Sequence, residues 1–235
     1  MIETPPIANT SPARIQSVDL LRGLIMVVMA IDHARVYSGL PAGGLTAGIF
    51  FTRWITHYCA PSFAFLAGTS AFLFFQKSGN RSEVVRFLIT RGLLLVILEI
   101  TAIRFFWMFN FDFSNFTFTG VIWMLGWCMI LLAAFLPLRA TTIAIIGLVI
   151  IFAQQLFGFV PNLFPQAWQE SVASVWQFFY PWKSGSAGGN ILSGIKTTPN
   201  TFGINIFYVI IPWIGVMMAG YGFGQILIGK RTSLR

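Results

Sequence analysis

Ionisable side chains interrupt segments of the chain that are otherwise apolar. A charged group surrounded by apolar residues is costly unless it faces a water-filled cavity or an opposite charge. Seven residues stand out in this way: Asp32, His33, Arg35, Arg53, His57, Glu99 and Arg104. Such a set could move a proton and bind a negatively charged group.

His33 and His57 are the natural candidates for proton transfer. The unperturbed pKa of histidine, about 6.5, allows its ring to take and give a proton near neutrality. In acyl transfer, a histidine can remove the proton from an attacking amine or hydroxyl, or accept the acyl group itself. Asp32, next to His33, could position the ring and stabilise its protonated form. His57 could equally be a structural histidine.

The arginines supply fixed positive charge. A guanidinium can hold a phosphate, a carboxylate or a developing oxyanion. Arg35, Arg53, His57, Glu99 and Arg104 are therefore candidates for binding the substrate or the acyl donor. The alternative is that the arginines and Glu99 form salt bridges that hold helices together.

The composition shows which kind of element must position these groups. Only 9% of the 235 residues are charged, whereas 56% are hydrophobic and 16% aromatic. Soluble domains carry about 25% charged residues. A chain of this size cannot hide so much apolar surface in its own interior. The composition excludes a soluble enzyme and a disordered chain, and predicts an integral membrane protein.

The apolar residues fall into six stretches of about 20 residues, the length that crosses a bilayer as a helix. The runs are continuous rather than alternating, which favours helices over a β-barrel. We predict an all-α, polytopic transmembrane bundle forming a single domain over residues 1–235. The six predicted spans are 18–37, 49–75, 87–109, 120–138, 140–159 and 204–228.

The distribution of Lys and Arg predicts an orientation. Basic residues concentrate in the connections that lie inside if both termini are cytoplasmic, and only Lys183 and Lys196 lie outside. The net charge of +8 then reflects topology, and no nucleic-acid partner is needed to explain it. The long connection 160–202 lies on the outer side. Its aromatic residues suggest a segment in the membrane interface, and it is either a plain tether or a lid or acceptor-binding loop.

In this arrangement the ionisable groups share a depth. At about 1.5 Å per residue, His33 and Glu99 lie roughly 20 Å and 18 Å from the inner edge. Arg53 and His57 lie roughly 6 Å and 12 Å below the outer edge. Asp32 and Arg35 are three residues apart, and Arg53 and His57 four, so each pair shares a helix face. We predict one hydrated cavity in the outer half of the membrane.

Four stretches resemble a known family. The first is Arg14-Ile-Gln-Ser-Val-Asp19-Leu-Leu-Arg22-Gly23, which leads into Ala30-Ile-Asp32-His33-Ala-Arg35. It resembles the opening of the heparan-alpha-glucosaminide N-acetyltransferase catalytic domain, within the transmembrane acyltransferases. The stretches 51–68, 120–126 and 211–221 fit the bacterial branch of this family.

The resemblance implies an acyltransferase of the cell inner membrane that passes an acetyl group from acetyl-CoA to a sugar amine or hydroxyl. It makes His33 the candidate catalytic residue, with Asp32 and Arg35 as neighbours and Arg53 and His57 lining the site. In the family the catalytic histidine lies in the loop before the second helix. Residues 38–50 contain no histidine, so only His33 or His57 can substitute. Family members continue with further helices, so we expect this chain to be the N-terminal portion of a longer fold.

Two other classes of function stay open. A permease could use the same charges to coordinate a small anionic solute or relay protons. A structural membrane subunit could pair them with a partner's helices. The sequence shows no internal repeat and no broken helix pair, which disfavours a transporter. Cys59 and Cys128 lie in apolar runs and match no zinc pattern, so we expect no metal. A homo-oligomer is left open.

Overall fold

We describe the fold from a computed structural model of the chain. It describes residues 16–38, 46–109, 117–180 and 204–233. Arg14, Lys183, Lys196 and the second half of the predicted outer connection, residues 181–202, lie outside these ranges.

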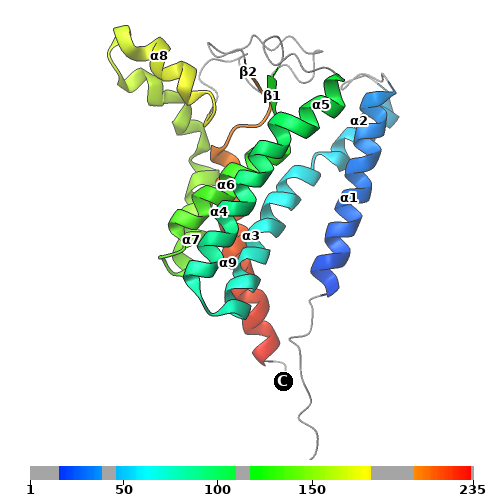
Figure 1. The fold of residues 1–235 in the computed structure, drawn as a ribbon, viewed down its shortest axis with the longest axis vertical. Coiled ribbons are helices and arrows are strands. Elements are labelled where there is room, and N and C mark those ends of the chain that lie inside the picture. The colour runs from blue at the N-terminus through cyan, green and yellow to red at the C-terminus, as the bar shows by residue number, and fades with distance from the viewer. Residues whose placement is uncertain (1–15, 39–45, 110–116, 181–203, 234–235) are drawn as a thin grey trace, which may run out of the picture.

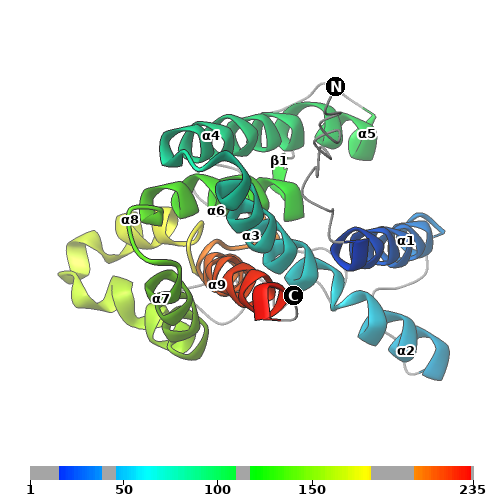
Figure 2. The same cartoon turned by 90° about the horizontal axis from the view of Figure 1, so that it is seen from below.

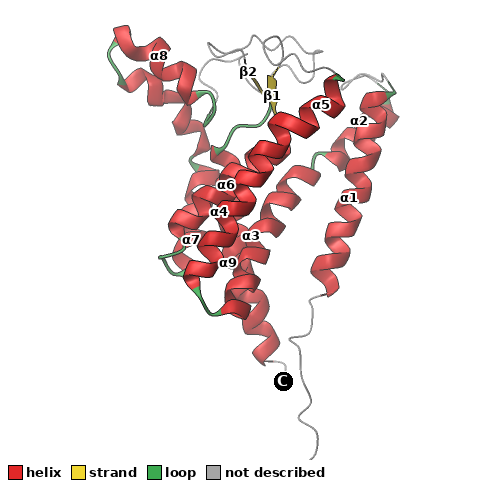
Figure 3. Ribbon diagram, viewed as in Figure 1, coloured by secondary structure: helices red, strands yellow, loops and turns green. Residues whose placement is uncertain are grey.

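The described residues are almost entirely helical (Figure 1). Two three-residue strands are the exception, and Figure 3 shows them at one end of the bundle. The elements in chain order are α1 (Gln16–Tyr37), α2 (Ala47–Thr56), α3 (Cys59–Ser78), α4 (Arg81–Leu98), the π-helix η1 (Glu99–Ile103), α5 (Arg104–Met108), β1 (Thr117–Thr119), α6 (Val121–Phe135), α7 (Ala140–Phe152), the 3-10 helix η2 (Gln154–Leu163), α8 (Gln166–Trp176), β2 (Ile204–Ile206) and α9 (Ile211–Ser233).

Helices occupy each of the six stretches predicted from hydropathy, but fewer qualify as membrane spans. Within the described ranges, two helical segments are long and apolar enough to cross a bilayer, 47–78 and 211–229. The bent pair of α7 and η2 makes a third if it counts as one span, and α6 is apolar but shorter. Charged residues interrupt α1 and α4 at four positions each. The all-helical, membrane-type architecture is thus confirmed, and the number of spans stays a proposal.

Three of the predicted helices are interrupted. The helix predicted over 49–75 breaks at His57 and Tyr58, between α2 and α3. The helix over 87–109 contains the π-turn η1. The stretch predicted as one helix over 140–159 bends by 73° between α7 and η2. The expectation of no broken helix pair was therefore wrong. Residue 153 is alanine, so no Gly or Pro at that position indicated the bend.

The last helix, α9, holds the centre of the bundle. It packs against α3 and α7, and α6 joins it to α4 (Figure 2). Glycines allow these helices to approach closely. A Cβ on Gly147 would lie 2.6 Å from the carbonyl oxygen of Gly215, and one on Gly92 would lie 2.6 Å from that of Gly126. The α7–α9 and α4–α6 pairs thus bring backbone against backbone, as small residues permit in membrane helices.

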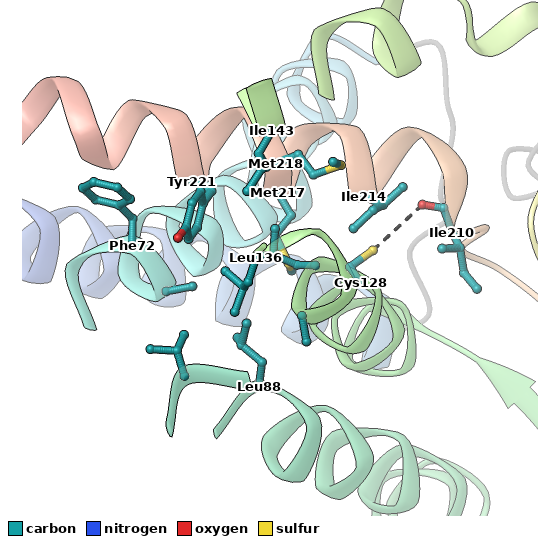
Figure 4. Packing of buried hydrophobic residues seen from close by; sticks show 14 of the residues in the cluster. Phe72, Leu88, Cys128, Leu136, Ile143, Ile210, Ile214, Met217, Met218 and Tyr221 are labelled. Atoms are coloured by element: carbon teal, nitrogen blue, oxygen red, sulfur yellow. Dashed lines mark hydrogen bonds between the residues drawn. The ribbon is translucent and has the colours of Figure 1, made fainter. Parts of the chain in front are cut away.

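A continuous apolar core fills the space between these five helices (Figure 4). Met217 and Met218 of α9 lie at its centre, fully buried. Cys128 of α6 is also fully buried and directs its thiol toward the carbonyl oxygen of Ile210, 3.9 Å away. Both cysteines are buried free thiols.

Helix α1 stands apart from this core and packs mainly on α3 and α2 (Figures 1 and 2). A small apolar cluster of Ile25, Cys59 and Leu66 joins α1 to α3. Near the start of α1, Arg22 donates hydrogen bonds to the hydroxyl of Ser70 and to the carbonyl oxygen of Leu66. Arg22 therefore fixes the half of α1 that is remote from the chemistry-bearing residues.

We expect Arg22→Ala to loosen α1 while leaving the core intact. Loss of hydrogen bonds from a charged donor costs about 1–2 kcal/mol, which corresponds to roughly tenfold faster local opening. Hydrogen exchange by mass spectrometry in detergent should show faster exchange in α1 and unchanged exchange in α6 and α9. Arg86→Ala, at an exposed position of α4, is the matched control. Equal exchange in both variants would refute this role of Arg22.

Candidate active site

The site residues on α1 lie in its last two turns, at the end of the molecule that also holds α2, α5 and the two strands (Figure 1). There Arg35 donates to the Oδ1 atom of Asp32 at 2.8 Å. Arg35 is only 7% exposed, and Asp32 is half-buried. The predicted pairing along one helix face is thus formed, on the turn of α1 that also carries His33.

His33 is held by its own helix. Its Nδ1 atom lies 2.8 Å from the carbonyl oxygen of Met29. A carbonyl oxygen only accepts hydrogen bonds, so Nδ1 carries the proton in the neutral ring. The Nε2 atom then has the free lone pair that a base or nucleophile needs. Met29, rather than Asp32, therefore orients the ring.

One aromatic ring from α5, that of Trp107, lies against this histidine. The ring centroids of His33 and Trp107 are 5.7 Å apart, and Trp107 stacks on Tyr37 at 4.8 Å with an interplanar angle of 13°. The end of α1 therefore contacts the end of α5 through three rings. This contact fixes His33 between two helices that are far apart in the sequence.

Helix α2 carries the next two candidate site residues near its end. Arg53 is half-buried in the last turn of α2, and His57 follows at the break before α3 with an exposed side chain. The backbone N–H of His57 donates to the carbonyl oxygen of Arg53 at 2.9 Å. Asp32 and Arg53 both lie within electrostatic range of the phenol of Tyr208, just before α9. Charges on both α1 and α2 therefore act on this phenol.

Glu99 is engaged with another helix. It is 2% exposed, and its Oε2 atom accepts a hydrogen bond from the backbone N–H of Trp123 at 3.3 Å. The amides of Gly120 and Ile122 also interact with this carboxylate. A negative charge at a helix N-terminus satisfies free amides and complements the helix dipole. Glu99 therefore caps α6.

The π-turn explains how Glu99 reaches α6. An extra residue in a helical turn changes the direction of the side chains in it, and such turns often occur at functional positions. Arg104 follows η1 directly and is 0% exposed. Arg104 also has an interaction partner. Glu99 and Arg104 are thus buried within the segment from α4 to α5, whereas the side chains of His33 and Arg53 are partly exposed.

Sequence reasoning missed three aromatic residues of this region, Tyr37, Trp107 and Tyr208. They were hard to single out because the chain contains 25 Phe and 8 Trp. The scarcity of tyrosine, with only 5 in the chain, was the one signal that could have identified two of them. A phenol at the end of an apolar segment tends to have a polar partner.

No group of three or more metal-binding side chains occurs within the ranges that the structure describes. Arg35 and Arg53 lie at the same end of the molecule as His33. A donor that carries phosphates would find its counter-charges there.

We expect Glu99→Ala to destabilise the protein by about 1–3 kcal/mol, since the α6 amides would be buried without an acceptor. Thermal unfolding in detergent, followed by tryptophan fluorescence, should show a lower melting temperature. Glu83→Ala is the control, because Glu83 lies in the first turn of α4 and is exposed. It should change the stability by less than about 0.5 kcal/mol. Equal melting of both variants would contradict the capping role.

Comparison with known proteins identifies a family. The family model described as "Heparan-alpha-glucosaminide N-acetyltransferase, catalytic" matches residues 14–235. Neither the comparison with curated proteins nor that with solved structures returned a match. The family match covers every described helix, including those that carry His33, Arg53 and Glu99. The chain therefore belongs to the heparan-alpha-glucosaminide N-acetyltransferase catalytic-domain family.

Proposed function

We propose that the chain is an integral membrane acyltransferase that moves an acetyl group from acetyl-CoA to a sugar amine or hydroxyl. The observation that carries the proposal is the state of His33. Its Nδ1 atom is committed to Met29, which leaves Nε2 as a base, and the same turn of α1 carries the Asp32–Arg35 pair. The family match supports acetyl transfer as the reaction class.

The transfer can follow either of two balanced routes. In the direct route, Nε2 of His33 takes the proton from the acceptor amine or hydroxyl as that atom attacks the thioester carbonyl. The carbon–sulfur bond then breaks, and CoA leaves as the thiolate. In the two-step route, Nε2 attacks the thioester itself and carries the acetyl group until the acceptor removes it.

The arginines provide positive charge in both routes. Arg53 is half-buried and can stabilise the carbonyl oxygen as it becomes negative, or bind a phosphate of the donor. Arg35 is bound to Asp32, so it fixes the electrostatic surroundings of His33. We assign Glu99 and Arg104 a structural role. They hold the segment from α4 to α5 in place, and through Trp107 they position His33. His57 lies at the exposed edge of the site.

We further propose six spans in the cell membrane, with both termini in the cytoplasm and the site facing outward. Support comes from the concentration of basic residues in the connections at the end of the molecule opposite the site, where Lys77, Arg81 and Arg139 lie. In this topology α7 is the fifth span and ends at the bend before η2.

Purified protein in liposomes, supplied with radiolabelled acetyl-CoA and glucosamine, tests the proposal. Labelled acetylglucosamine is the expected product, and boiled protein is the control. The bend between α7 and η2 is the observation that favours a transporter, because broken helices occur at transporter binding sites. Solute flux into the same liposomes without acyl-CoA, and no acetylated product, would favour that alternative and refute ours.

A further inference from the structure

The segment from η2 to α8 leaves the bundle as an arm (Figures 1 and 2). Its first half, η2, makes an angle of 73° with α7. If α7 runs along the membrane normal, η2 runs nearly parallel to the membrane surface. This bend is a separate feature from the proposed acetyl-transfer site.

The outer surface of the arm is apolar. Phe152 at the bend is 84% exposed, and Leu163 at the far end of η2 is 81% exposed. The other exposed large apolar side chains on the arm are Leu156, Phe159, Phe164, Trp168 and Val175. A continuous exposed apolar surface marks contact with a membrane or a partner.

The same surface continues onto α7. A shallow apolar hollow ends at the bend, and it is lined by Ile145, Leu148, Val149, Phe152 and Ala153. These residues recur every three or four positions, so they form one face of the helix. Exposed apolar side chains thus occur on both sides of the bend, on α7 and on the arm.

The chemistry of the arm points to lipid as the occupant. Glu170 is the only charged residue between 140 and 180. Protein interfaces usually have a polar rim, whereas residues buried in the boundary of a bilayer are apolar with Trp and Tyr near the head groups. Trp168, Trp176 and Tyr180 supply such amphipathic rings.

The arm is fixed to the bundle at its base. Trp176 donates its Nε1–H to the carbonyl oxygen of Phe157 at 2.9 Å, which ties α8 to η2. The backbone N–H groups of Ile210 and Ile211 donate to the carbonyl oxygens of Phe178 and Phe179, at 3.1 Å and 3.0 Å. The angle of the arm is therefore set by the start of α9.

We propose that η2 and α8 lie in the plane of the membrane, with the apolar side chains of the arm inserted among lipid acyl chains at the head-group boundary. Because the arm has almost no charge, its insertion does not require anionic lipid. It fixes the depth at which the bundle sits.

Nitroxide labels on Leu156→Cys and Leu163→Cys test the proposal in nanodiscs of uncharged phosphatidylcholine. Collision with O2 reports lipid, and collision with a water-soluble nickel chelate reports solvent. The two sites are seven residues apart, or about 14 Å along a 3-10 helix. At 73° to α7 their depths should differ by only about 4 Å, and both should favour O2.

The controls are Ile97→Cys on the exposed apolar face of α4 and Ser82→Cys at its exposed start. They should report lipid and water respectively. A depth difference near 14 Å would mean that η2 continues across the membrane, and would overturn the proposal. Labels at Leu156→Cys and Leu163→Cys that collide more with the nickel chelate than with O2 would also overturn the proposal. Strong coupling between two Leu163→Cys labels would assign the surface to a second copy, with the same consequence.

Discussion

Replacing Gly220 by alanine should lower the melting temperature by several degrees. The new Cβ would overlap the backbone carbonyl of Phe65 on α3, which cannot move aside as a flexible side chain would. The bond from the Thr69 hydroxyl to the carbonyl oxygen of Gly220, 3.0 Å long, would be strained as well. We expect a net loss of about 2 kcal/mol, or roughly 4–8 °C in a chain of this size.

Gly229 provides the matched control on the same helix. A Cβ there would meet nothing within 4 Å, so alanine should be neutral or stabilise α9 through its higher helix propensity. Scanning fluorimetry in detergent compares the two variants directly. Leucine at both positions extends the series: Gly220→Leu should fail to fold, and Gly229→Leu should not. Equal melting of the two alanine variants would show that α3 and α9 do not pack as described.

Replacing His33 by alanine should reduce acetyl transfer by about 10²–10⁴-fold, the usual contribution of a general base. The loss should appear in kcat, since His33 acts on the proton rather than on donor binding. The fold should survive, because the side chain is half-buried and contacts mainly Met29 and Trp107. Transfer of label from acetyl-CoA to glucosamine in liposomes measures the effect, and added imidazole should restore part of the rate.

His57→Ala is the control for chemistry. Its side chain is exposed at the break between α2 and α3, so we expect activity within about threefold of the original. A large loss with His57→Ala and none with His33→Ala would exchange their roles. Full activity after replacing both would exclude histidine catalysis.

Hydropathy predicted where the helices lie, because the cost of exposing backbone to lipid depends on local composition. It could not predict the breaks. The π-turn that begins at Glu99 and the bend at Ala153 depend on contacts made far away in the sequence. The strand pairing of Thr117 with Ile204 joins segments almost ninety residues apart and has no local signal.

The site was predictable in part for the same reason. The Asp32–Arg35 pair is local, so its spacing was enough to find it. Glu99 was expected to bind substrate or form a salt bridge, but its partners are backbone amides of α6, and amides carry no sequence signature. Trp107 reaches His33 from a helix over seventy residues away.

The central position of α9 has a consequence for biosynthesis. Helices α3 and α7 leave the ribosome well before α9, yet each packs chiefly against it. Until α9 is inserted, Gly68 and Gly147 face lipid with no backbone opposite them. The bundle therefore closes only when its final described helix enters, and the earlier helices must wait side by side in the bilayer. Pulse labelling with stalled chains should detect compact, protease-resistant protein only after residue 229 has left the translocon.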